Sequence, residues 1–135
     1  GRAIRGERNW VVQVRGVDFV LLSVTDVERS AAFYRDTLGL KATAEWPPSW
    51  YEFEAGETTI AIGVPPDEAP QPPFNGGTTV ALAVADAKSA MEELRAKGVP
   101  VLQDVQETPV CFMGLIADPD GNLLWLHQRK DGSAG

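Results

Sequence analysis

The feature that most constrains this chain is an internal repeat. The run FVLLSVTD at 19–26 and the run TVALAVAD at 79–86 are both apolar and both end in Val-x-Asp, with a constant offset of 60 residues (79 − 19 and 86 − 26). Each run is followed by an amphipathic stretch that ends at a glycine. Self-similarity at a fixed period indicates that one supersecondary unit occurs twice. We therefore expect two copies of a strand followed by a helix.

The two amphipathic stretches predict helices over about 26–38 and 86–97. Asp26 and Asp86 are suited to cap the first turns, because an aspartate side chain accepts hydrogen bonds from free backbone N–H groups there. Gly39 and Gly98 are suited to the left-handed position that follows a helix. Apolar residues recur at helical spacing, which gives each helix one face to bury. These residues are Val27, Ala31, Tyr34 and Leu38, and then Ala87, Ala90, Met91 and Leu94.

Three strand-like segments follow each helix, and turn residues separate the last two of each set. Gly56 and Gly121 supply the positive φ that such turns need. The predicted strands are 40–46, 50–54 and 58–63, then 99–105, 109–116 and 122–128. The fold class that follows is α+β, with two tandem βαβββ units.

A proline-rich segment divides the two units. Residues 64–77 contain five prolines, which are incompatible with a helix or a central strand. We expect one domain at 17–128, because 135 residues is an ordinary single-domain length. Its parts are unit one at 17–64, a linker at 65–77 and unit two at 78–128. Residues 1–16 are expected to be an arm, native or left over from processing or expression, and 129–135 a tail.

Charge and composition exclude some partners. The net charge of −7 argues against nucleic acid, which requires a basic face. No apolar run approaches the roughly 20 residues that cross a bilayer, and no signal peptide is indicated. The single cysteine, Cys111, lies in an apolar run and is expected to be a buried, inert thiol, which fits a cytoplasmic protein. Arg29, Arg35 and Arg95 are expected to be solvated on the helices.

Two strings now resemble the vicinal oxygen chelate superfamily of glyoxalases, extradiol dioxygenases and bleomycin-resistance proteins. They are V-x-D-x-x-x-S-x-x-F-Y-x-x-x-L-G-L at 24–40 and D-P-D-G-N at 118–122. The resemblance covers about residues 17–128. It implies that each unit curls into a half-barrel of mixed strands with its helix packed outside. It also implies a cavity inside the curled sheets, and a homodimer.

In the enzymes of that superfamily, a divalent metal binds His and Glu ligands on the first and last strand of each unit. In that family the ligand on the first strand lies five residues before the valine of Val-x-Asp. The corresponding residues of this chain are Phe19 and Thr79 (24 − 5 and 84 − 5). The ligand on the last strand is the middle residue of an apolar triplet. The triplets here are IAI at 60–62 and LWL at 124–126, so the corresponding residues are Ala61 and Trp125. Phe, Ala and Trp carry no metal donor atom, and a neutral Thr hydroxyl is a poor donor for a transition metal. The sequence therefore predicts no metal and no other cofactor.

What remains in the cavity is aromatic. Phe19, Trp125 and either Trp50 or Tyr51 are expected on the inner wall. They would either fill the space as core or form a slot for a planar ligand by stacking. The ligand-binding residues expected are Phe19, Trp50, Ala61, Thr79, Trp125 and His127.

Two classes of function stay open. The first is a metal-independent protein that binds a planar apolar or cationic small molecule and performs no chemistry, as drug-sequestering resistance proteins do. The second is a lyase, isomerase or oxidoreductase with an atypical metal site or a residual acid or base. His127, Glu52 and Glu54 are the candidate catalytic residues, although each is more often a structural or solvated side chain. The missing metal donors favour the first class.

Overall fold

The structure is a computed structural model, and it describes residues 13, 17–67, 69, 71–73 and 78–134. The predicted arm at 1–16 and part of the predicted linker lie outside the described residues, and the division into 17–64, 65–77 and 78–128 stays a prediction. No helix or strand occurs in the described part of the linker. The elements of unit one are β1 (Val20–Ser23), α1 (Val27–Ala32), η2 (Phe33–Thr37), β2 (Lys41–Trp46), β3 (Trp50–Ala55) and β4 (Thr58–Gly63). Those of unit two are β5 (Val80–Ala83), α2 (Ala87–Ala96), β6 (Val101–Glu107), β7 (Cys111–Ala117) and β8 (Leu123–Arg129).

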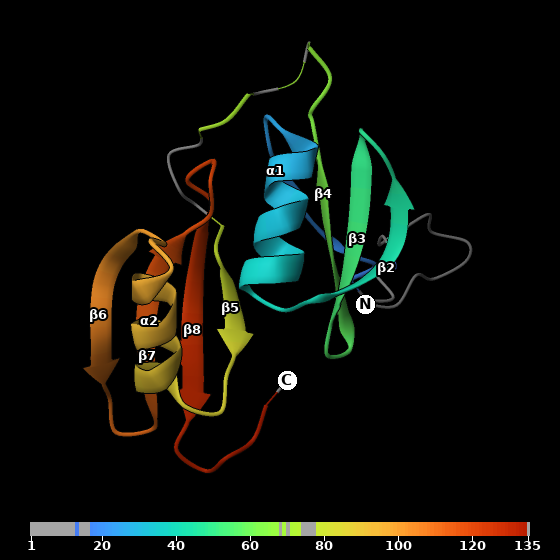
Figure 1. Cartoon of the computed structure of the whole chain (residues 1–135). Helices are drawn as coiled ribbons and strands as arrows, with labels where there is room; N and C mark the ends of the chain where they lie inside the picture. The colour runs from blue at the N-terminus through green and yellow to red at the C-terminus, as the bar shows by residue number, and fades with distance from the viewer. Residues whose placement is uncertain (1–12, 14–16, 68, 70, 74–77, 135) are drawn as a thin grey trace, which may run out of the picture.

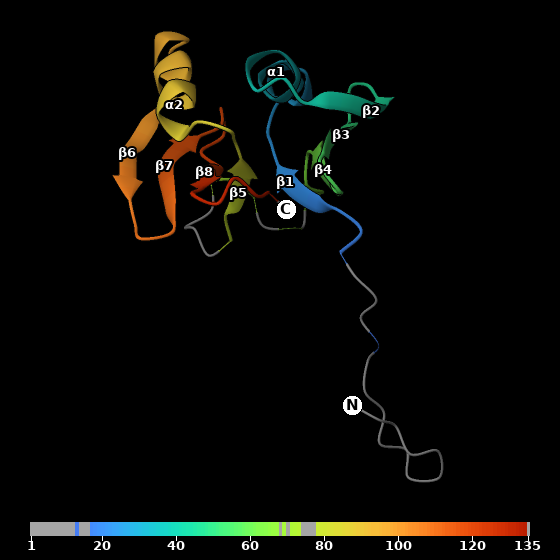
Figure 2. The same ribbon diagram turned by 90° about the horizontal axis from the view of Figure 1, so that it is seen from below.

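The two units repeat one topology, so the predicted α+β fold of tandem βαβββ units is confirmed. Unit one has the strand order β1-β4-β3-β2 and unit two has the order β5-β8-β7-β6. In each sheet the first strand pairs parallel to the last, and the other pairs are antiparallel. Figure 1 shows the two sheets beside each other, with α1 lying against unit one on the side nearer β5. Figure 2 shows both helices on the same side of the molecule.

The predicted capping residues act as expected. Asp26 Oδ1 accepts from the backbone N–H of Arg29, and Asp86 Oδ1 accepts from that of Ser89. Gly39 and Gly98 adopt φ angles of 77° and 81°, which side chains disfavour. No described helix is long and apolar enough to cross a membrane.

The first helix differs from the continuous α-helix predicted over 26–38. From Phe33 onward it widens into a π-helical turn, in which the Leu38 N–H donates to the Phe33 carbonyl at 2.9 Å. The wider turn reduces the angle between neighbouring side chains. As a result the adjacent aromatic residues Phe33 and Tyr34 are both buried.

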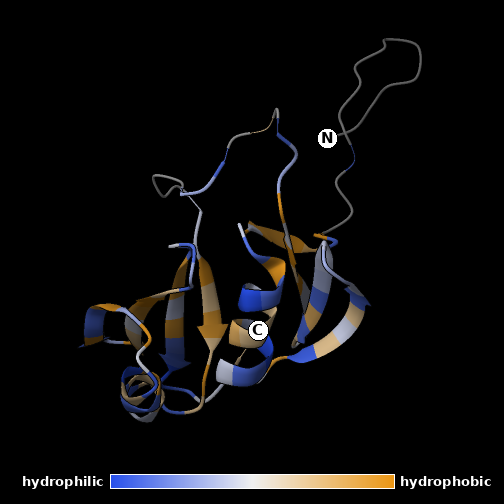
Figure 3. Ribbon diagram, turned by 45° about the horizontal axis from the view of Figure 1, so that its top comes forward, coloured by the Kyte–Doolittle hydropathy of each residue, from blue (hydrophilic) through white to orange (hydrophobic). Residues whose placement is uncertain are grey.

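Alternation along the strands separates two faces of each sheet. Val24, Ile60, Ile62, Leu124 and Leu126 are at most 2% exposed and form the core under the helices. The opposite face of each sheet carries no helix, and we call it the helix-free face. Figure 3 shows apolar residues along the strands of both units, and mixed polar and apolar residues on both helices. Cys111 is buried, as predicted.

The two family-like strings in the sequence bind each other, which joins the units. Tyr34 Oη donates to Asp118 Oδ2 at 2.8 Å, and both side chains are buried. Asp118 also accepts from the backbone N–H groups of Asp120 and Asn122 and from Asn122 Nδ2. Asn122 Nδ2 further donates to the Ser23 carbonyl on β1 at 3.0 Å. A buried carboxylate is thereby satisfied by both units.

Asp120, two residues after Asp118, adds further hydrogen bonds between the two units. It accepts from the N–H and hydroxyl of Thr25, from Arg29 Nη2 at 3.1 Å and, at 3.4 Å, from the Ser30 hydroxyl. The expectation that Arg29 is merely solvated is therefore wrong. Its guanidinium is half exposed, but it forms an ion pair with a carboxylate of the other unit.

Candidate functional site

The helix-free face of unit one carries an aromatic corner. Phe19 lies directly before β1 and is 45% exposed, and its ring meets the Trp50 ring edge-on, with centroids 6.0 Å apart. The Trp50 ring lies over Gly63 of β4, where an added Cβ would come within 2.8 Å of the indole. Gly63 therefore makes room for the indole. Tyr51, the alternative to Trp50, is 4% exposed and stacks on Phe53 in the core.

Glu52 holds the Trp50 indole in place. The Trp50 Nε1–H donates to Glu52 Oε2 at 2.9 Å, because the two residues are two positions apart on β3 and share one face. Glu54 follows on the same face and is exposed. Ala61 is fully buried in β4, between Leu21 and Glu52 of the adjacent strands. A ligand on this face would meet Leu21, which is 46% exposed, before it met Ala61.

The helix-free face of unit two carries the other predicted ligand-binding residues. Trp125 and His127 are both half-buried on β8. In the register of the sheet, Trp125 lies opposite Ala81 on one side and Leu115 on the other, and His127 lies opposite Ala83 and Met113. Thr79 lies just before β5 and is exposed. The indole and imidazole rings therefore have a small neighbour on the β5 side and a large apolar neighbour on the β7 side.

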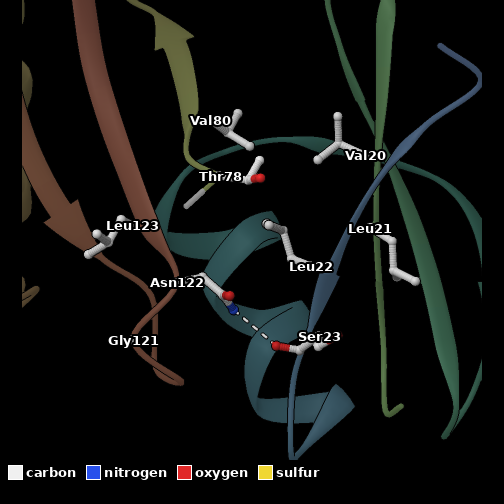
Figure 4. A pocket seen from close by; sticks show the side chains of 9 residues that line it. All are labelled: Val20, Leu21, Leu22, Ser23, Thr78, Val80, Gly121, Asn122 and Leu123. Atoms are coloured by element: carbon white, nitrogen blue, oxygen red, sulfur yellow. Dashed lines mark hydrogen bonds between the residues drawn. The ribbon is translucent and has the colours of Figure 1, made fainter. Parts of the chain in front are cut away.

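Two clefts occur where the units meet. The first, of about 330 Å³, lies between β1, β5 and the start of β8. Figure 4 shows Asn122 reaching across it to the carbonyl of Ser23. The second, of about 790 Å³, is lined mostly by apolar residues of β1, β4, β5 and α2, and also by the glutamates Glu54, Glu57 and Glu93. Neither cleft is lined by the predicted ligand-binding residues.

The structure thus places the predicted residues in two groups. Phe19, Trp50 and Glu52 form one group on unit one, and Trp125 and His127 lie together on unit two. Within the described part of the chain, no ring contact joins Trp125 to Phe19 or Trp50. Sequence reasoning did not single out Met113 or Leu115. Leu21 shares the parity of Phe19, and that signal was present in the sequence.

The electrostatics of the molecule are strongest at the contact between the units. Burial, and then the Asp118 carboxylate, raise the pKa of Tyr34 far above its usual value. Among the described residues, no three His, Cys, Asp or Glu side chains come close enough together to hold a metal ion. Three of the four residues at the positions that the resemblance assigns to metal ligands, Phe19, Ala61 and Trp125, have no donor atom, and the fourth is Thr79.

Comparison with known proteins now identifies the family. A sequence model of the Glyoxalase/Bleomycin resistance protein/Dioxygenase superfamily matches residues 16–126. The chain belongs to this superfamily. It is 30% identical over 132 residues to a lactoylglutathione lyase of Salmonella typhimurium, a match that covers 85% of this chain and 93% of that enzyme. It is 29% identical over 119 residues to the glutathione transferase FosA of Serratia marcescens, covering 84% and 81% of the two chains.

Solved structures of the glyoxalase superfamily share the fold. The chain is similar to TnmS3, an antibiotic binding protein from Streptomyces sp. CB03234, with a TM-score of 0.71 and 23% identity. That match covers 89% of this chain and all of TnmS3. At this identity the likeness shows a common fold.

Proposed function

We propose that this glyoxalase-superfamily chain is a metal-independent protein that binds and sequesters a planar, apolar or cationic small molecule. The observation that carries the proposal is the set of residues at the four positions where the family's enzymes bind their metal. Here these residues are Phe19, Ala61, Thr79 and Trp125.

These four residues do not fit a divalent transition metal. Such sites need several nitrogen, sulfur or carboxylate donors, and structural and catalytic zinc sites keep at least three protein ligands. A single imidazole, His127, lies near Trp125 on β8. Removing the metal also removes the charge with which the family's enzymes hold the oxygens of a substrate. Affinity must then come from burial and ring stacking.

The helix-free faces carry exposed apolar and aromatic side chains on which a planar ligand could stack. Phe19 and Leu21 are nearly half exposed although both are large and apolar, and Trp50 and Trp125 each have one small neighbour across the sheet, Gly63 and Ala81. Exposed apolar surface is typical of a binding face. A stacked ring that buries about 100 Å² gains roughly 2.5 kcal/mol before entropic costs. TnmS3, named as an antibiotic binding protein, has the same fold and supports an antibiotic as one class of ligand and a role in antibiotic resistance.

A homodimer would enclose these faces. β1 and β2 are the edges of the first sheet, and Val17, Phe19 and Leu21, next to or on β1, are exposed. Pairing with a second copy would cover both the edge and the apolar residues. We propose a cytoplasmic homodimer without nucleic-acid or membrane partners, with the ligand enclosed between curled units. Light scattering at micromolar concentration should give twice the mass of 14.6 kDa, and a monomer mass would contradict the dimer.

A second candidate, an enzyme, is favoured by the identity to lactoylglutathione lyase and to FosA. In this reading His127, Glu52 or Glu54 would act as an acid or base. His127 faces the helix-free side and could exchange a proton with a bound ligand. No second acid or base lies beside it in register, where its neighbours are Ala83 and Met113.

One experiment separates the two functions. Protein dialysed against a chelator is analysed for zinc, iron, nickel and manganese, and is then screened by thermal shift against aromatic antibiotics and planar metabolites. A ligand at about 100 times its dissociation constant adds about 2.7 kcal/mol, which raises the Tm by several degrees. The same protein is assayed for lactoylglutathione lyase activity with and without added metal.

The proposal expects metal-free protein to respond to planar ligands and to show no lyase activity with any metal. Stoichiometric metal retained through dialysis, or lyase activity restored by metal, would support the enzyme instead.

A further inference from the structure

The helix-free face of unit one contains a carboxylate whose environment is unusual for a solvated glutamate. Glu52 lies in the middle of β3 and is half-buried. Its Oε2 accepts the Trp50 indole N–H at 2.9 Å. Within the described residues no cation forms an ion pair with Glu52, and its Oε1 accepts no hydrogen bond. A negative charge that is partly removed from water and left unpaired costs free energy.

The cross-strand neighbours of Glu52 leave space around that charge. Ala44 lies opposite it on β2 and Ala61 lies opposite it on β4, so neither flanking strand offers a cation. Lys41 of β2 lies opposite Glu54 in the register of the sheet, and no ion pair joins Lys41 to Glu52 in the described part of the chain. The Trp50 ring is fixed over Gly63 and meets Phe19 edge-on. A free carboxylate oxygen therefore lies at the edge of an immobilised aromatic corner.

This arrangement suits one chemical group. A cationic nitrogen with N–H donors would form a charge-assisted hydrogen bond with Glu52, and its ring system would pack on the corner of Phe19 and Trp50. We propose that Glu52 selects a protonated nitrogen in a planar aromatic ligand. The inference rests on the proposed function, and it makes Glu52 a specificity-determining residue instead of an acid or base.

The test uses two ring systems of the same shape. 9-Aminoacridine is a planar cation with N–H donors at neutral pH, and acridine is neutral. Dissociation constants are measured by fluorescence titration for wild type, Glu52→Gln and Glu45→Gln. The Glu52→Gln amide oxygen can still accept from Trp50, so the substitution removes charge and leaves the ring in place. Glu45→Gln makes the same change at an exposed position of β2, opposite Tyr51.

The wild type should prefer 9-aminoacridine to acridine by about tenfold, the ratio expected of one charge-assisted hydrogen bond. In Glu52→Gln the preference should fall to about twofold or less, with acridine affinity unchanged, while Glu45→Gln keeps it. Part of the preference should persist at about 0.5 M NaCl, which screens attraction to the net charge of the whole protein.

Three results would overturn the inference, and only one of them would also overturn the proposed binding function. Equal affinity of wild type for the two probes, or an equal loss in both variants, would remove the role of Glu52 and leave the binding function intact. Failure of both probes to bind at millimolar concentration would overturn the inference together with the proposed stacking function.

Discussion

The two faces of each sheet differ in how deeply their apolar side chains are buried. On the helix side, side chains such as Phe53 and Leu124 are fully buried, and the contact between the units satisfies a buried Asp118. On the helix-free side, alternate residues of comparable size, such as Phe19 and Leu21, stay nearly half exposed. The comparison indicates that the helix side provides stability, and the exposed apolar residues of the helix-free side support the proposal that this side binds a ligand.

Two neighbouring leucines on β8 test whether only the helix side stabilises the fold. The change in stability expected here is the largest of those we predict. Leu124→Ala removes a side chain that is 0% exposed, and should lower the free energy of unfolding by about 2–5 kcal/mol. Leu123→Ala, the same change one residue earlier on the other face, should cost about 1 kcal/mol or less. Urea denaturation measures both. Equal losses would show that both faces are core.

Asp118→Ala tests the contact between the units. It leaves Tyr34 Oη and the Asn122 donors without their acceptor, and should cost about 3 kcal/mol. As a control, Asp131→Ala alters an exposed carboxylate that accepts only from Ser133 and should change stability by about 0.5 kcal/mol at most. If thermal unfolding gave similar Tm values for the two variants, the contact would not stabilise the fold.

Tyr34→Phe should cost about 1 kcal/mol near neutral pH, because it removes one hydrogen bond to Asp118. The raised pKa of Tyr34 adds a dependence on pH. The unfolded state releases this proton above about pH 10 and the folded state does not, so wild type loses about 1.4 kcal/mol per pH unit above that value. Tyr51, whose pKa burial and Glu28 also raise, is present in both proteins and cancels.

The stability difference between wild type and Tyr34→Phe should therefore narrow as the pH rises past about 10, and then reverse. Urea denaturation of both proteins at a series of pH values measures it. A difference that stayed constant through this range would mean that the tyrosine hydroxyl ionises freely in the folded protein.

The smallest effect is expected at the edge of the same contact. Arg29→Ala removes an ion pair with Asp120, and the arginine side chain is 48% exposed. Screening by water limits the loss to about 0.5–1 kcal/mol, which should fall further in high salt. A loss as large as that of Asp118→Ala would extend the stabilising region to the surface of α1.

Local signals in the sequence predicted most of the fold. The parity of β1 separated Leu21 from Leu22 and Val24, and Asp26 and Gly39 marked the ends of the first helix. The bonds between Tyr34 and Asp118, 84 residues apart, were not predicted, because they depend on how the two units pack. The π-helical turn at Phe33–Thr37 was not predicted either.

The candidate site was predicted less completely. The parity of β3 puts Trp50 and Glu52 on one face, but the hydrogen bond between them was not predicted. It did not show that the predicted residues would lie in two groups, Phe19 with Trp50 and Trp125 with His127. That separation is set by the packing of one unit against the other.

The measurement that tests the central claim most directly is the effect of Trp125→Ala on ligand affinity and on stability in the same protein. In the proposed dimer the ligand lies between the Phe19 and Trp50 corner of one curled unit and the Trp125 face of another. The affinity of metal-free protein for acridine should therefore fall by about tenfold, while the Tm changes by only about two degrees. Unchanged affinity together with a Tm lowered by several degrees would contradict it, because Trp125 would then be part of the core.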